Sequence, residues 1–132
     1  MRLLLIVLAL IGILPTVCAF AADAKDSAAK GKELNHVVLI KFKEGASEDQ
    51  IKKVEQAFAA LKEKVPGVLS LKWGTNVSPE NKNKGFTHAF VLTFGSDKDR
   101  DGYLVHPAHR DFGKVLGPVV GDVLVIDFWS HE

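Results

Sequence analysis

The chain has 132 residues, and its 17 lysines and arginines nearly balance its 16 aspartates and glutamates, giving a formal net charge of +1. This balance argues against the basic footprint of a nucleic-acid-binding protein, so we expect no nucleic-acid partner. The single cysteine, Cys18, cannot form a disulfide framework. We therefore expect one domain whose core comes from apolar burial.

Residues 1–21 begin with a positive charge at Arg2, continue with an apolar run and end in small residues at Ala19 and Ala21. This order is typical of a secretory signal peptide, with cleavage expected after Ala21. The apolar run is shorter than the roughly 20 residues that cross a bilayer, so we predict no stable membrane anchor. Residues 22–33 are small and charged, which indicates a flexible leader. We therefore predict an exported protein, periplasmic or extracellular.

The first structured elements are a strand and a helix. Residues 34–43, LNHVVLIKFK, predict a strand that is apolar on both faces in its first half. Ser47 and Gln50 then form a capping-box pattern. The apolar residues that follow recur at spacings of three and four, which predicts one amphipathic helix: Ile51, Val54, Phe58, Leu61 and Val65. Pro66-Gly67 ends this helix.

The second half of the chain alternates strands with short helices. A strand over 68–76 is predicted to place Leu69, Leu71 and Trp73 on one face, and a polar turn connects it to a strand over 86–94. Ser96 starts a helical region that reaches about Val105. Pro107 suits the first turn of a further helix, which Gly117-Pro118 ends. Residues 119–129, VVGDVLVIDFW, predict the last strand.

This order of elements predicts a ferredoxin-like α+β fold, βαββαβ, with an antiparallel sheet and helices on one face. The first and last strands carry apolar residues on both faces, and helices can cover only one of them. An uncovered apolar sheet face marks an association surface. We therefore predict a two-fold homodimer in which two sheets pack face to face as a dimeric α/β barrel.

Three segments together carry a family resemblance: HVVLIKFKEGAS, WGTNVSPENKNKGFTHAFVLTF and YLVHPAHRDF. With the apolar last strand they resemble the stress-responsive A/B barrel domain, called Dabb, over residues 34–130. The resemblance implies a ferredoxin-like fold and a dimeric barrel. Some plant members are polyketide cyclases that use a tyrosine and a histidine for an aldol condensation, and these positions match Tyr103 and His109. His36 and His88 match two further histidines of such members.

Tyr103 and His109 stand six residues apart across the Pro107 corner. A neutral imidazole can remove a proton next to a carbonyl, and a phenol can donate to the carbonyl oxygen that gains charge. This chemistry needs no cofactor. The alternative is that both side chains only satisfy hydrogen bonds at a buried helix corner.

The other candidate residues are expected to line a small cavity or to pack in the core. His106 and His109 are three residues apart, but a zinc site needs a third ligand from a definable motif, so we predict no metal. His36 and His88 are expected to be hydrogen-bonded core histidines or to border the cavity. The predicted ligand-binding set also contains His106, Phe90 and Phe112.

Two functions therefore stay open. The first is an exported, dimeric barrel protein that holds a small apolar or phenolic ligand, and the export signal favours it. The second is a cofactor-free, polyketide-cyclase-like lyase that uses Tyr103 and His109 as an acid/base pair, and the YLVHPAH motif favours it.

Overall fold

The computed structural model describes residues 31–131. The predicted signal peptide and most of the predicted leader lie outside this range. The elements in chain order are β1 Leu34–Phe42, α1 Glu48–Ala59, α2 Leu61–Lys64, β2 Val68–Thr75, β3 His88–Phe94, α3 Asp97–Val105, α4 Pro107–Leu116 and β4 Val120–Trp129. All strand pairs are antiparallel, in the order β2-β3-β1-β4. The predicted ferredoxin-like α+β fold is thus confirmed.

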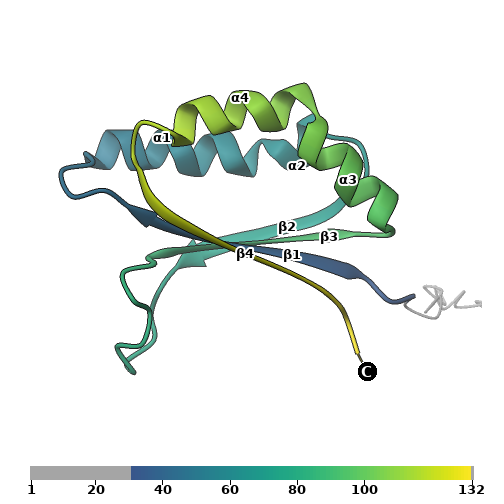
Figure 1. The fold of residues 1–132 in the computed structure, drawn as a ribbon, viewed down its shortest axis with the longest axis horizontal. Coiled ribbons are helices and arrows are strands. Elements are labelled where there is room, and N and C mark those ends of the chain that lie inside the picture. Colours follow the sequence, from purple (N-terminus) through teal and green to yellow (C-terminus); the bar gives the residue numbers. More distant parts are fainter. Residues whose placement is uncertain (1–30, 132) are drawn as a thin grey trace, which may run out of the picture.

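The molecule has two layers, with all helices on one face of the sheet (Figure 1). In β1 every second residue is buried beneath the helices: Leu34, His36, Val38 and Ile40. Between the layers, Phe58 of α1 stacks on Phe90 of β3 with ring centroids 3.8 Å apart. Phe58 also meets Phe112 of α4 edge-on at 4.7 Å. These three rings join both long helices to the sheet.

Helix α1 begins as the sequence predicts. The Ser47 side chain accepts a hydrogen bond from the Gln50 backbone, and the Gln50 side chain accepts one from the Ser47 backbone. The helix is shorter than predicted, since it ends at Ala59 and a separate turn, α2, follows. Ala60 keeps right-handed helical angles, so Leu61 and Val65 still face the core.

The prediction that Leu69 shares a face with Leu71 and Trp73 is wrong. The register of β2 against β3 shifts between Val68 and Ser70. Such a bulge inserts one extra residue and inverts the alternation. Val68 is therefore the buried residue, whereas Leu69 is 55% exposed. Strand β3 also begins later than predicted, at His88, because Phe86 closes a turn on Asn83.

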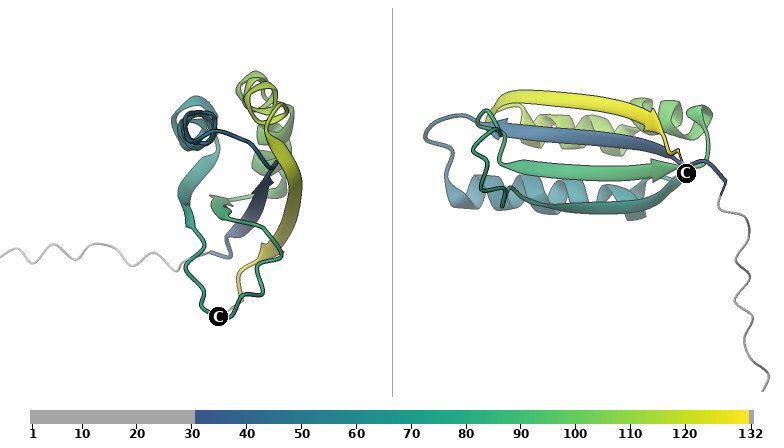
Figure 2. Two further views of the ribbon diagram at one scale, coloured as in Figure 1. Left: turned by 90° about the vertical axis from the view of Figure 1, so that its left-hand side faces the viewer. Right: turned by 90° about the horizontal axis from the view of Figure 1, so that it is seen from below.

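The second face of the sheet has no described element over it (Figure 2, right). Cross-strand partners point to the same side of a sheet, and Val37 pairs with Ile126 while Leu39 pairs with Leu124. This apolar open face therefore contains Val37, Leu39, Leu124, Ile126 and Phe128. The predicted uncovered apolar face is present. The edge strand β4 is also open toward the helices, where Val125 is 52% exposed.

Candidate functional site

The segment YLVHPAH forms the corner between α3 and α4. Ser96 caps α3, accepting a hydrogen bond from the Asp99 backbone. Pro107 occupies the first turn of α4. Backbone N–H groups of a first turn have no partner within the helix, so the missing N–H of proline costs no hydrogen bond there. His106 caps α4, because its Nδ1 accepts a hydrogen bond from the Ala108 backbone at 3.1 Å. His106 therefore has a structural role at this corner.

The corner brings Tyr103 and His109 into contact, with ring centroids 4.6 Å apart. Tyr103 is only 1% exposed and also contacts Phe94 and His36, at centroid distances of 5.3 Å and 5.6 Å. Burial raises the pKa of Tyr103 above its ordinary value, so the phenol stays protonated. No fully buried side-chain nitrogen or oxygen in residues 31–131 lacks a hydrogen-bond partner. The Tyr103 hydroxyl is therefore either hydrogen-bonded or in contact with solvent.

His109 is the more accessible member of the pair, being half-buried. Its Nδ1 lies 3.1 Å from the Leu104 carbonyl oxygen. A carbonyl only accepts, so Nδ1 carries the hydrogen and the neutral ring keeps a lone pair on Nε2. Burial lowers the pKa of His109, the Leu104 hydrogen bond partly opposes this, and the neighbouring His36 lowers the pKa further. At neutral pH His109 is therefore an uncharged base.

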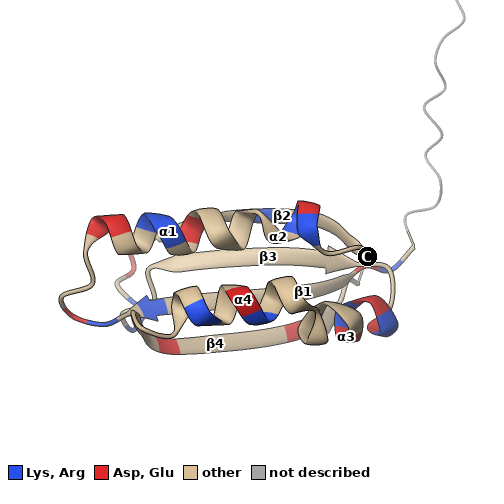
Figure 3. Ribbon diagram, turned by 90° about the horizontal axis from the view of Figure 1, so that it is seen from above, with Lys and Arg blue, Asp and Glu red and all other residues tan. Residues whose placement is uncertain are grey.

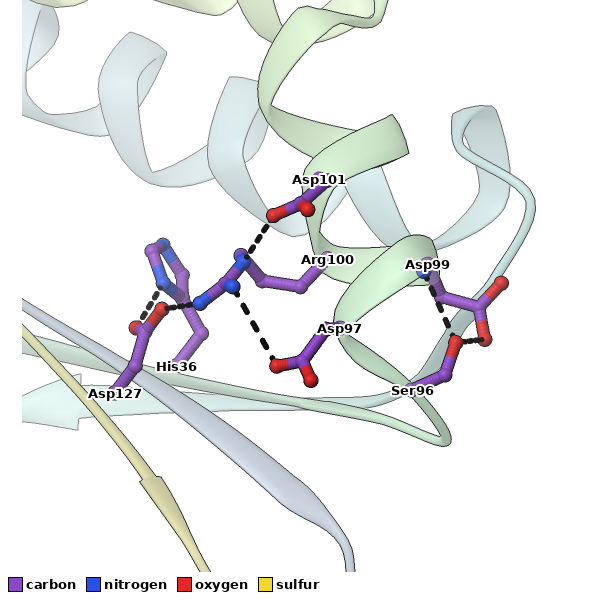
Figure 4. A network of polar contacts seen from close by, with 7 residues as sticks. All are labelled: His36, Ser96, Asp97, Asp99, Arg100, Asp101 and Asp127. Carbon is purple, nitrogen blue, oxygen red and sulfur yellow. Dashed lines mark hydrogen bonds and ion pairs between the residues drawn. The ribbon is translucent and has the colours of Figure 1, made fainter.

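His36 extends this cluster toward the edge of the sheet. Its Nδ1 lies 2.6 Å from Asp127 Oδ1, and the second oxygen of Asp127 pairs with Arg100 of α3 (Figure 4). Asp127 and Arg100 are not among the site residues predicted from the sequence. The sequence does show Asp127 as the one charged residue of the apolar segment VLVIDFW. Its partner cannot be found in the same way, because only the β1–β4 register pairs Asp127 with His36.

His88 does not join the cluster. Its Nε2 lies 3.0 Å from Glu55 of α1, and its Nδ1 lies 2.9 Å from the Thr87 hydroxyl. It lines a cavity of about 460 Å³, which extends beneath the β2–β3 loop to Leu39 on the open face. The four predicted histidines therefore lie at three places: His36 and His109 border Tyr103, His88 lies at the cavity beneath the β2–β3 loop, and His106 caps a helix.

The two predicted ligand-binding phenylalanines lie in the core. Phe90 is fully buried between Phe58 and Trp73. Phe112 is also buried, and borders a groove of about 310 Å³ between α4 and the α1–α2 segment. Neither Tyr103 nor His109 lines this groove or the cavity at His88. Of the pair, His109 is half-buried and reaches the surface, whereas Tyr103 is only 1% exposed.

Charge is distributed without a dominant sign over the helix face. Figure 3 shows basic and acidic residues interspersed along α1, α3 and α4. In residues 31–131 no three histidine, cysteine or acidic side chains are placed to share a metal ion. No described helix is long and apolar enough to cross a membrane.

Comparisons with known proteins identify the family of this chain. The profile of the stress responsive A/B barrel domain matches residues 34–130. The stress-response A/B barrel domain-containing protein HS1 of Arabidopsis thaliana is 37% identical over 100 residues, covering 76% of this chain and 91% of that protein. Olivetolic acid cyclase of Cannabis sativa is 30% identical over 99 residues, covering 75% and 98%.

Solved structures agree with this assignment. The hydroxynitrile lyase of Passiflora edulis superposes with a TM-score of 0.72 at 28% identity, covering 77% of this chain and 96% of that one. A dimeric ferredoxin-like protein of unknown function from Jannaschia sp. superposes with a TM-score of 0.64 at 26% identity, covering 73% and 97%. The corner motif, the two-layer fold and these matches together show that the chain belongs to the stress-responsive A/B barrel domain family.

Proposed function

We propose that the protein is a cofactor-free acid–base enzyme of the lyase or cyclase class, acting on a small carbonyl compound at Tyr103 and His109. The observation that carries the proposal is their ring contact of 4.6 Å. It joins a protonated phenol to an imidazole whose Nε2 carries the free lone pair. Relatives named a cyclase and a lyase support a reaction of this class.

In the proposed reaction, His109 Nε2 removes a proton from the carbon next to a carbonyl. The electron pair of that C–H bond forms an enolate, which attacks a second carbonyl carbon and makes a C–C bond. The Tyr103 hydroxyl donates a hydrogen bond to the oxygen that gains charge. The proton on His109 then passes to the new alkoxide, so the imidazole returns to its neutral state. The reverse sequence breaks a C–C bond.

A second candidate function is binding of a small apolar or phenolic ligand without turnover. The burial of Tyr103 favours it, because a side chain that is 1% exposed reaches a substrate only if its surroundings move. Both candidates place the ligand against His109. They differ in whether a bond in the ligand is made or broken.

The two candidates separate in one experiment. Phenolic and β-keto compounds are first screened by thermal shift, and the compounds that raise the melting temperature are then followed by mass spectrometry for conversion. Turnover that His109→Ala and Tyr103→Phe both abolish supports the enzyme. Arg110→Ala, an exposed change on the same helix, should leave turnover unchanged. Binding without any product supports the second function, and full activity in His109→Ala refutes the proposed mechanism.

We further propose a homodimer in which the apolar open faces of two copies pack together. The open face supports this, because monomers rarely leave such a patch in water. A dimeric structural neighbour from Jannaschia sp. supports it as well.

Export remains a proposal that rests on residues 1–21 of the sequence. N-terminal sequencing of the protein from its native cell fraction tests it. A mature chain that starts close to Ala22 and is found outside the cytoplasm supports export. An intact N-terminus in the cytoplasm contradicts it.

A further inference from the structure

Arg100 forms ion pairs with three aspartates beside the proposed site. It lies in the first half of α3, and its side chain is 21% exposed. Its Nε donates to Asp101 at 2.8 Å, and its Nη2 lies 3.6 Å from Asp97. Its Nη1 donates across to Asp127 of β4 (Figure 4). Two of its partners belong to its own helix, and the third joins that helix to the exposed edge strand.

Asp127 is held at both oxygens by this arrangement. Oδ1 accepts from His36 Nδ1 at 2.6 Å, and Oδ2 accepts from Arg100. A carboxylate that is bonded at both oxygens cannot rotate without breaking one of these bonds. The guanidinium stays charged at every physiological pH, so Arg100 is a permanent hydrogen-bond donor to this carboxylate. An ionised carboxylate only accepts hydrogen bonds, so the hydrogen between it and His36 belongs to His36.

The hydrogen bond to the Asp127 carboxylate determines which ring nitrogen of His36 carries the hydrogen. A ring with its hydrogen on Nδ1 keeps its neutral lone pair on Nε2. In Figure 4 this Nε2 points away from Asp127 and toward the helix layer. The His36 ring is buried, and it meets Tyr103 edge-on with centroids 5.6 Å apart. The groups against the ring include Asp127 from β4, Phe94 from β3 and Tyr103 from α3, and His109 of α4 is near enough to interact with it electrostatically.

We propose that Arg100 is a positioning residue for the site: through Asp127 it holds His36 with its hydrogen on Nδ1 and its Nε2 lone pair on the side of the helix layer, where Tyr103 lies against the ring. Arg100 itself does not touch the proposed reacting atoms. This role rests on the proposed function only for its effect on turnover, because the tautomer of His36 exists with or without a reaction. The two can therefore fail separately.

The test is the ring ¹⁵N spectrum of the histidines, recorded in the folded protein at a pH where the rings are neutral. In the unaltered protein we expect the pattern of a single tautomer at His36, with hydrogen on Nδ1. In Arg100→Leu we expect this pattern to be lost and a fraction with hydrogen on Nε2 to appear. His88 is the control within the same spectrum, because Glu55 holds its hydrogen on Nε2 far from Arg100. Arg110→Leu is the matched control for removing an exposed arginine.

A second variant covers the case in which Arg100→Leu does not fold. Arg100→Lys keeps the charge but loses the planar fork, so it cannot bond Asp101 and Asp127 in the same geometry. We expect a smaller but measurable Nε2–H fraction at His36, with His88 unchanged. An unaltered single tautomer at His36 in a folded Arg100 variant overturns the proposal. If a substrate is found, Arg100→Leu should lower kcat; a tautomer shift without any substrate supports the positioning role even where the proposed reaction is refuted.

Discussion

Replacing Ile126 with aspartate places a charge in the centre of the apolar open face. Ile126 lies on β4 opposite Val37, with Leu124 and Phe128 on the same face, and it is 53% exposed in the single protomer. Its side chain makes no part of the core beneath the helices. The protomer should therefore fold normally, and the substitution should act on association alone.

The magnitude follows from the exposed part of the side chain. Burying a whole isoleucine contributes about 1.5–3 kcal/mol, so covering the exposed half contributes about 1 kcal/mol. Two-fold symmetry doubles this, so losing the contact alone costs about 2 kcal/mol. Each aspartate also loses its water, which costs several kcal/mol for an unpaired carboxylate. A total of about 4 kcal/mol or more corresponds to a dimer Kd raised by about 1,000-fold.

Sedimentation velocity over a dilution series measures this effect. The unaltered protein should sediment as a dimer, and Ile126→Asp should sediment as a monomer with an unchanged far-UV circular dichroism spectrum. Val115→Asp, an equally drastic change on the helix layer, should stay dimeric. A dimer that survives Ile126→Asp would refute the face-to-face packing, and an unaltered protein that stays monomeric at high concentration would refute the dimer itself.

Three further predictions concern the protomer. Phe58→Ala removes the ring that stacks on Phe90 and meets Phe112, and should lower the free energy of unfolding by about 3–5 kcal/mol in urea titration; a loss below about 1 kcal/mol would contradict the central place of this ring. Ser47→Ala removes one half of the capping box and should cost about 1 kcal/mol by the same assay, whereas Ser78→Ala in the β2–β3 loop should cost less. Because the pKa of His109 is lowered on folding, the unfolded chain binds its proton first, so stability falls as the pH drops from 6.5 toward the lowered value. Thermal melts should show that His109→Gln removes this part of the acid loss, and an identical pH profile in the variant would contradict the burial of His109.

The sequence by itself determined the order of elements, because periodicity and caps act over a few residues. The spacing of Val54 and Phe58, the Ser47–Gln50 box and the Pro107 start are local features, and each appears where the pattern predicts. The first and last strands carry apolar residues on both faces, and this pattern also predicted the open face. A bulge leaves no such local sign, so Leu69 was assigned to the wrong face.

Only the tertiary structure decided which candidate residues meet. Tyr103 and His109 lie near in sequence, and their contact follows from the α3–α4 corner. His36 and Asp127 are 91 residues apart, and only the β1–β4 register brings them to 2.6 Å. The separate β1–β3 register places His88 opposite Ile40, four residues beyond His36 along β1, where Glu55 binds it instead. Strand register depends on the packing of a whole sheet face, which no short stretch of sequence contains.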